Sequence, residues 1–157
     1  MASKAIPDGS FSSPVFLGFD IGSVSLNTVV IDEKNNILEE HYDYIYGRPF
    51  NVLKDRLFSL MEKYTDESIR GIALTGTGGK LASSLIGGVF VNEIIAQATS
   101  TSILYPDAKT VIEIGGEDSK LIILEKNPEN GHSRLVDFEM NSICAAGTGS
   151  APPWRPR

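Results

Sequence analysis

One structural block occurs twice in this sequence, and this duplication constrains the fold more than any other feature. The block consists of a strand, a glycine turn, a second strand, a polar turn and a third strand. In the first copy, alternating or continuous apolar residues predict strands at Val15–Asp20, Leu26–Asp32 and Ile37–Tyr46. In the second copy, the same patterns predict strands at Thr110–Ile114, Ser119–Leu124 and Arg134–Phe138. Matching Gly22 to Gly116 gives an offset of about 94 residues. Such a repeat indicates two related lobes rather than one irregular domain.

The residues between the two copies predict three helices and two further strands. Because very short turns join the three strands of each block, these strands are antiparallel neighbours. Helical spacing of apolar residues begins near Asn51, which we expect to be an N-cap, and ends at Tyr64. The remaining elements are a strand, a short helix, a short strand and a helix with Asn92 as its N-cap; they are expected at Ile69–Leu74, Lys80–Ile86, Val89–Val91 and about 93–104. The fold class is therefore α/β.

The length and the pattern together predict one lobe and part of another. The chain has 157 residues, which is enough for one domain of ordinary size. We expect a first lobe at 14–106 and a truncated start of a second lobe at 107–150. Residues 1–13, rich in Ser, Gly and Pro, are predicted to be a flexible leader. Residues 151–157 hold three Pro and two Arg, and we interpret them as a non-native or disordered tail.

Charge and cysteine content narrow the class of partner. The formal net charge is −6, which argues against a nucleic-acid groove or an anionic membrane surface as the main partner. The single cysteine, Cys144, cannot form an internal disulfide, and we therefore predict a cytoplasmic location. No apolar run approaches the roughly 18 residues that a membrane helix needs.

The two glycine turns are the candidate ligand sites. Neither the Walker A pattern nor the dinucleotide fingerprint fits the glycine loop at 75–79, because Leu81 stands where each requires another residue. In contrast, Asp20-Ile21-Gly22-Ser23 and Gly115-Gly116-Glu117-Asp118 each place glycines and a carboxylate in a tight turn between strands. Glycine lets backbone N–H groups approach phosphate, and a nearby carboxylate suits Mg²⁺, usually through water. The alternative is that both are ordinary glycine hairpins.

Four segments carry a resemblance to a known superfamily. They are Gly18–Ser23, Val91–Ala96, Ile112–Lys120 and Asn141–Gly149. With these segments the sequence resembles the actin/Hsp70/sugar-kinase superfamily. More narrowly, it resembles the BadF/BadG/BcrA/BcrD-type activator ATPases of 2-hydroxyacyl-CoA dehydratases and benzoyl-CoA reductases, also called CoA-substrate-specific enzyme activases. The resemblance covers about Val15 to Ser150, and its last segment is the most specific.

The resemblance implies an actin-like, ribonuclease H-like ATPase fold with ATP and Mg²⁺ as ligands. The first lobe would hold a three-stranded antiparallel meander plus parallel strands and helices, and the start of a second similar lobe would follow. Asp20 and Asp118 would be the catalytic carboxylates near Mg²⁺, through water. The residues implied in phosphate binding are Gly22, Ser23, Ser25, Gly115, Gly116 and Glu117.

The resemblance also gives the single cysteine a role. It implies that Cys144 is a ligand of a [4Fe–4S] cluster that bridges two subunits, each supplying two cysteines. ATP turnover would then drive a low-potential electron into an acyl-CoA dehydratase or reductase partner. Without the motif around it, composition alone favours the interpretation that Cys144 is merely a small buried residue. Because such a cluster needs four thiolates, we expect that this chain alone holds no complete cluster. Because much of the second lobe is missing, we also expect weak or no ATPase activity.

Departures from the family pattern keep two alternatives open. Family members often have a lysine where Asn27 stands, and many have glutamine where Glu117 stands. The second cluster cysteine is absent. The chain could therefore be part of a sugar- or acetate-kinase-like phosphotransferase of the same superfamily, or a non-catalytic nucleotide-binding module. His41 is expected to have a solvated or cross-strand role, and Lys80 to be a solvated residue at a helix start, rather than catalytic ones. Glu93 is a weak candidate for the site.

Overall fold

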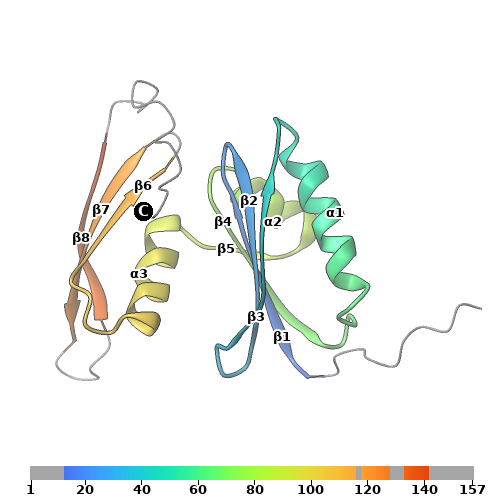
Figure 1. The fold of residues 1–157 in the computed structure, drawn as a ribbon, viewed down its shortest axis with the longest axis horizontal. Coiled ribbons are helices and arrows are strands. Elements are labelled where there is room, and N and C mark those ends of the chain that lie inside the picture. The colour runs from blue at the N-terminus through green and yellow to red at the C-terminus, as the bar shows by residue number, and fades with distance from the viewer. Residues whose placement is uncertain (1–12, 116–117, 128–132, 142–157) are drawn as a thin grey trace, which may run out of the picture. The chain divides into compact units, whose positions relative to one another are not determined.

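The computed structural model describes residues 13–115, 118–127 and 133–141, which form two compact units (Figure 1). The first unit ends at Val91 and the second begins at Asn92. Among the described residues, no helix is both long enough and apolar enough to cross a membrane. The order of elements matches the repeat predicted from the sequence, with one meander in each unit.

The first unit is built on a five-stranded mixed sheet with the order β3-β2-β1-β4-β5. Its first three strands form the antiparallel meander, and the last two run parallel to β1. The strands are β1 (Val15–Ile21), β2 (Ser25–Asp32), β3 (Ile37–Tyr44), β4 (Ile69–Thr75) and β5 (Val89–Phe90). The α/β class, with an antiparallel meander followed by parallel strands, is therefore confirmed.

Two helices supply the apolar partners of this sheet. Alternate residues of β1 are buried, from Val15 through Ile21, as a strand with one covered face requires. They form one core cluster with buried residues of α1 (Pro49–Met61) and α2 (Gly79–Ile86), among them Leu53, Leu60 and Ala82. Asp20 belongs to the other set of alternating residues and so lies on the face of β1 away from this core.

The second unit packs one helix on a three-stranded antiparallel meander, β6-β7-β8. Its elements are α3 (Glu93–Leu104), β6 (Thr110–Ile114), β7 (Ser119–Lys126) and β8 (Ser133–Met140). Its core joins Ile94 and Ala98 of α3 to Ile122 and Leu124 of β7. Position 120 precedes these two residues on the same face of β7 by the alternation of the strand, and it is occupied by lysine.

The starts of α3 and α1 test the N-caps predicted from the sequence. The Asn92 side chain accepts a hydrogen bond from the Ile94 backbone N–H at 2.9 Å, so the predicted N-cap of α3 is confirmed. The prediction for α1 was wrong: Arg48 is its N-cap residue and Pro49 is its first residue. Proline suits this position because its φ is already helical and it has no N–H to leave unpaired. Asn51 is instead an exposed helix residue.

The end of β3 and the grouping of α3 also differ from the sequence-based expectation. β3 ends at Tyr44 rather than Tyr46, because the backbone of Tyr46 turns to a φ of +44°. The contacts group α3 with the second sheet, whereas the first lobe was expected to extend to residue 106. The lobe boundaries of the whole protein, the leader at 1–13 and the tail at 151–157 stay predictions.

Candidate functional site

The first glycine hairpin closes at the end of β1. Gly22 N–H donates to the Ser25 carbonyl at 3.0 Å, and Ile21 stands opposite Leu26 in the ladder. Ser23 is exposed and Ser25 half-buried. The turn therefore presents backbone and a hydroxyl to solvent, as the phosphate-binding prediction requires.

Asp20 is held at this hairpin by its neighbours on both sides. Its carboxylate accepts a hydrogen bond from the Asn27 side-chain amide at 3.2 Å, and the two residues face each other across β1 and β2. On the other side, the glycine loop after β4 comes so close that a Cβ on Gly76 would lie 2.5 Å from Asp20 Oδ1. Gly76 also has a φ of +79°, which disfavours any residue with a side chain. Asp20 is thus fixed where the carboxyl ends of parallel β1 and β4 meet, a common place for ligand sites in α/β sheets.

Thr75 is a polar residue at this position that the sequence reasoning missed. It is the last residue of β4 and stands opposite Asp20 in the parallel ladder. Its Oγ1 is buried and has no hydrogen-bond partner among the described residues. The available signal was its place directly before the glycine loop, at the carboxyl end of a strand. Asn27, Asp20 and Thr75 thus form a polar row across three strands.

The second hairpin repeats the first with the same register. Gly115 N–H donates to the Asp118 carbonyl at 2.9 Å, and Ile114 stands opposite Ser119 as Ile21 does opposite Leu26. The register therefore equates Gly22 with Gly115, an offset of 93 residues rather than about 94. Gly116 and Glu117, two of the predicted phosphate-binding residues, lie outside the described residues.

This register changes which residues correspond in the two hairpins. The residue equivalent to Asp20 is Glu113, and the residue equivalent to Asn27 is Lys120, because each pair is cross-strand in its own ladder. Asp118 corresponds by position to Ser25. The two predicted catalytic aspartates therefore occupy different positions of the repeat, one before the turn and one at its end.

Lys120 and three carboxylates form a cluster at the second hairpin that the sequence reasoning did not find. The Lys120 ammonium lies 2.9 Å from Asp118, 3.0 Å from Glu113 and 3.0 Å from Glu93. Its side chain is only 3% exposed. Burial alone would lower the pKa of Lys120, but hydrogen bonds to Asp118, Glu113 and Glu93 outweigh it and raise the pKa above its ordinary value. Lys120 is therefore a permanent cation, and Glu93 belongs to this cluster.

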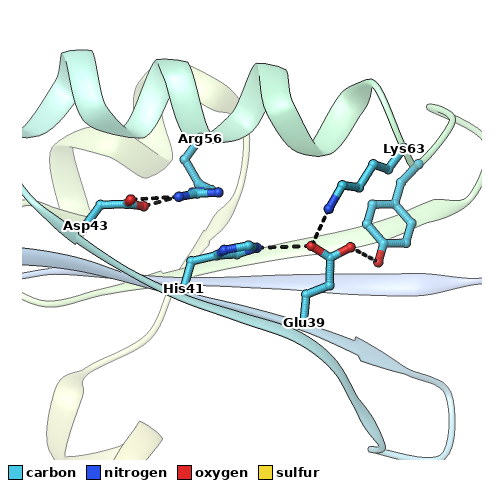
Figure 2. Close-up of polar contacts among 6 residues, drawn as sticks. Glu39, His41, Asp43, Arg56 and Lys63 are labelled. Atoms are coloured by element: carbon cyan, nitrogen blue, oxygen red, sulfur yellow. Dashed lines mark hydrogen bonds and ion pairs between the residues drawn. The ribbon is translucent and has the colours of Figure 1, made fainter.

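A second polar cluster joins β3 to α1 in the first unit (Figure 2). Glu39 accepts hydrogen bonds from Lys63 and from the Tyr64 hydroxyl, both at 2.8 Å, and its carboxylate lies 3.0 Å from His41 Nε2. Nearby, Arg56 donates two hydrogen bonds to Asp43, at 2.7 and 2.8 Å. His41 thus pairs with a residue of its own strand, two positions away, rather than with one across the sheet.

The electrostatics of this cluster suit a structural role. Partial burial pushes the pKa of Glu39 upward, but the hydrogen bonds from Lys63, Tyr64 and His41 outweigh it and lower the pKa to about 2. Burial and the Glu39 contact raise the pKa of Tyr64 to about 12. Both groups keep one protonation state near neutral pH, which is unsuitable for proton transfer.

Two of the remaining predictions concern residues that are not part of the two hairpins. Lys80 is an exposed residue in the first turn of α2. Cys144, the predicted cluster ligand, lies outside the described residues. Within the described ranges, no group of three or more His, Cys, Asp and Glu side chains could hold a metal ion on its own.

Comparison with known proteins shows which family the chain resembles. The sequence matches the BadF/BadG/BcrA/BcrD ATPase family over residues 17–152. It is 30% identical over 138 residues to the (R)-2-hydroxyglutaryl-CoA dehydratase activating ATPase of Acidaminococcus fermentans. The aligned region covers 85% of this chain and 49% of the relative.

Solved structures give the same result. The fold matches component A of the (R)-2-hydroxyglutaryl-CoA dehydratase of Acidaminococcus fermentans with a TM-score of 0.72 and 28% identity, over 87% of this chain and 51% of that one. It matches the activator of the 2-hydroxyisocaproyl-CoA dehydratase from Clostridium difficile, solved with bound ADPNP, with a TM-score of 0.68 and 28% identity, over 86% and 48%. The chain spans about half the length of the curated relatives it matches. The actin-like ATPase fold is thereby confirmed, and the chain belongs to the BadF/BadG/BcrA/BcrD ATPase family.

Proposed function

We propose that this chain supplies ATP-binding elements of an activator that hydrolyses ATP to drive electron transfer into a dehydratase or reductase of CoA substrates. The observation that carries the proposal is the pair of register-matched glycine hairpins, each with a carboxylate beside its turn. Family membership supports the ATPase part. The named relatives are activators of acyl-CoA dehydratases, which supports a partner of that class.

Asp20 in the first unit and Asp118 in the second are each a carboxylate of the kind that binds a magnesium ion arriving with a nucleotide. Such an ion takes one or two protein carboxylates and keeps phosphate oxygens and waters as its other ligands. Asp118 is one-third exposed, and Asp20 stands opposite Thr75, whose hydroxyl has no hydrogen-bond partner within the part of the chain that the structure describes. When bound, Mg²⁺ would neutralise charge on the phosphates.

The residues of the two turns have separate tasks in this proposal. Gly22 and Gly115 would let phosphate approach the turn backbone without side-chain hindrance; their own N–H groups close the hairpins, so the donors would be the other backbone N–H groups of each turn. The Ser23 and Ser25 hydroxyls add donors at the first turn, and Glu117 and Gly116 would belong to the second. Asp20, fixed between Asn27 and Gly76, would orient the water that attacks the terminal phosphate.

The cluster and the assembly are part of the same proposal. Cys144 would be one ligand of a [4Fe–4S] cluster shared in a homodimer, in which the thiolates hold iron and the cluster carries the electron. Two copies of this chain supply two cysteines, so anaerobic reconstitution with iron and sulfide should give no stable four-iron dimer. A brown dimer with four irons per two chains would contradict this prediction. The reducing cytoplasm stays a prediction from the single cysteine.

Nucleotide binding is the direct test of the proposed function. Titration of the chain with ATP and Mg²⁺ in a calorimeter should show binding that is weakened about tenfold or more by Asp20→Asn, because the Mg²⁺ ligand loses its charge. Asp55→Asn, an exposed change of the same kind on α1, should leave affinity unchanged. Absence of ATP binding by the unmodified chain, or equal effects of the two variants, would refute the proposal.

A further inference from the structure

The cluster around Lys120 gathers charge from three separate parts of the second unit. Glu93 is the first residue of α3, Glu113 lies in β6, and Asp118 ends the glycine turn. All three carboxylates lie within 3.0 Å of one ammonium. An ammonium has three N–H donors, so Lys120 can satisfy one oxygen of each carboxylate with no donor left over.

The charges in this cluster do not balance. Three carboxylates surround one cation, and among the described residues Lys120 is the only cation paired with any of them. The lysine is 3% exposed, whereas the side chains of Glu93, Glu113 and Asp118 are 26–33% exposed. The surplus negative charge therefore lies on the accessible side of the cluster, where a further cationic group can reach it.

Packing alone does not require a lysine at this position. Ile122 and Leu124, the next residues on the same face of β7, are apolar and fully buried against α3. Apolar residues in place of the lysine and its carboxylates together would continue that core, and such packing is often as stable as a buried ion pair. The presence of a lysine is explained instead by its contact with the Asp118 carboxylate at the end of the turn.

The glycine of the turn is part of the same arrangement. A Cβ on Gly115 would lie 3.2 Å from Asp118 Oδ1 and 3.8 Å from Glu113 Oε1. The turn therefore packs directly on the two carboxylates that Lys120 holds. Any shift of Asp118 away from Lys120 changes the space beside the turn backbone.

We propose that Lys120 is the positioning residue of the second hairpin: its ammonium holds the Asp118 carboxylate at the glycine turn in the orientation that binds the magnesium ion of ATP-Mg. The inference rests on the proposed function. Lys120 does not itself contact the nucleotide, since its three N–H groups are used by carboxylates. Its effect on the nucleotide passes through Asp118, with Glu113 and Glu93 fixing the ammonium from the strand and the helix.

A double-mutant cycle on ATP-Mg binding tests this directly. Calorimetric titration of the chain should show that Lys120→Met and Asp118→Asn each raise the Kd by about tenfold. The double variant should be no weaker than Asp118→Asn alone, because the lysine acts through that carboxylate. The matched control is Lys126→Met, which removes an exposed ion pair with Asp107 from the same strand and should leave the Kd within about twofold.

The outcomes separate the two proposals. If the unmodified chain binds ATP-Mg and Lys120→Met binds equally well, or if the two substitutions act additively, the positioning role is wrong and the proposed function stands. If the unmodified chain does not bind, both are wrong. If circular dichroism shows that Lys120→Met does not fold, the same cycle is run with Lys120→Arg. Arginine keeps the charge but cannot reproduce the contacts of one ammonium with three separate carboxylates. We then expect a smaller rise in the Kd, of about threefold, that is again absent in the Asp118→Asn background.

Discussion

The two glycine hairpins share one backbone plan and differ in the charge placed on it. In the first, Asp20 faces the neutral amide of Asn27; in the second, Glu113 faces the ammonium of Lys120 at the equivalent position. The first carboxylate is fixed by a glycine loop that follows a neighbouring strand. The second is fixed by a buried cation that also reaches Asp118 and Glu93.

This difference shows how a repeat can keep its geometry and diverge in chemistry. Strand register and turn length set where the carboxylates stand, and these are the same in both units. What holds each carboxylate depends on elements outside the repeat: β4 and its glycine loop in the first unit, and the start of α3 in the second. The hairpins should therefore respond differently to the loss of equivalent residues.

The largest expected difference is between the two cross-strand partners. Lys120→Met leaves three partly buried carboxylates without a cation, and removal of one partner of such a cluster costs about 3–4 kcal/mol. Asn27→Leu removes one hydrogen bond from a neutral amide to the Asp20 carboxylate and should cost about 1.5 kcal/mol. Urea unfolding of both variants at neutral pH measures the two values. Equal losses would show that the buried cation of the second hairpin has no special role in stability.

Glycine at position 76 should be the next most sensitive site. Gly76→Ala combines a positive φ with a Cβ 2.5 Å from Asp20 Oδ1 and 2.6 Å from the Ile21 carbonyl oxygen. Gly47→Ala is a matched control, since Gly47 has a φ of +73° and open space where its Cβ would lie. Both variants carry the backbone strain of about 1 kcal/mol, and Gly76→Ala should lose about 2 kcal/mol more through the clash. A loss equal to that of Gly47→Ala would mean that the loop moves freely away from Asp20.

Much of this arrangement follows from sequence, because it depends on local pattern. Alternating apolar residues located the strands, and Asn92 marked the start of α3. The predicted start of α1 was wrong because Asn51, two residues after Pro49, is also a residue type that favours N-caps. Neither polar cluster could be foreseen: Lys120 meets Glu93 across 27 residues and Tyr64 meets Glu39 across 25. Such contacts depend on how helices pack on sheets, which no local pattern reports.

The stability of the two units should also depend differently on pH, because the polar clusters have central groups of opposite charge. In the first unit an anion, Glu39, lies at the centre, with its pKa lowered from 4.5 to about 2. Between these pH values the folded state binds fewer protons than the unfolded state, so stability is complete above pH 4.5 and falls as the pH drops toward 2. We expect a loss on the order of 2 kcal/mol. In the second unit the pKa of the central cation, Lys120, is raised, so the contribution of that lysine is lost only as alkaline pH rises through its folded value.

Substitution of Glu39 isolates this acid-sensitive contribution. Urea unfolding of Glu39→Gln at pH 7 and pH 3 should show a smaller difference between the two pH values than the unmodified chain. Glu40→Gln changes the exposed neighbour in β3 and should leave the difference unaltered. An unchanged difference in Glu39→Gln would place the acid sensitivity of the first unit elsewhere.

The smallest expected effect comes from giving the first hairpin the cation of the second. Asn27→Lys places an ammonium opposite Asp20, at the position that Lys120 holds opposite Glu113. Asn27 is only half-buried, so the new pair should add at most about 0.5–1 kcal/mol and weaken with added salt. Asn51→Lys, which adds the same charge at an exposed position of α1, should change stability by less. Thermal unfolding at low and high salt compares the two. A salt-sensitive gain in Asn27→Lys alone would show that the two hairpins are exchangeable at this position, whereas a loss would show that the Gly76 loop around Asp20 leaves no room for a lysine there.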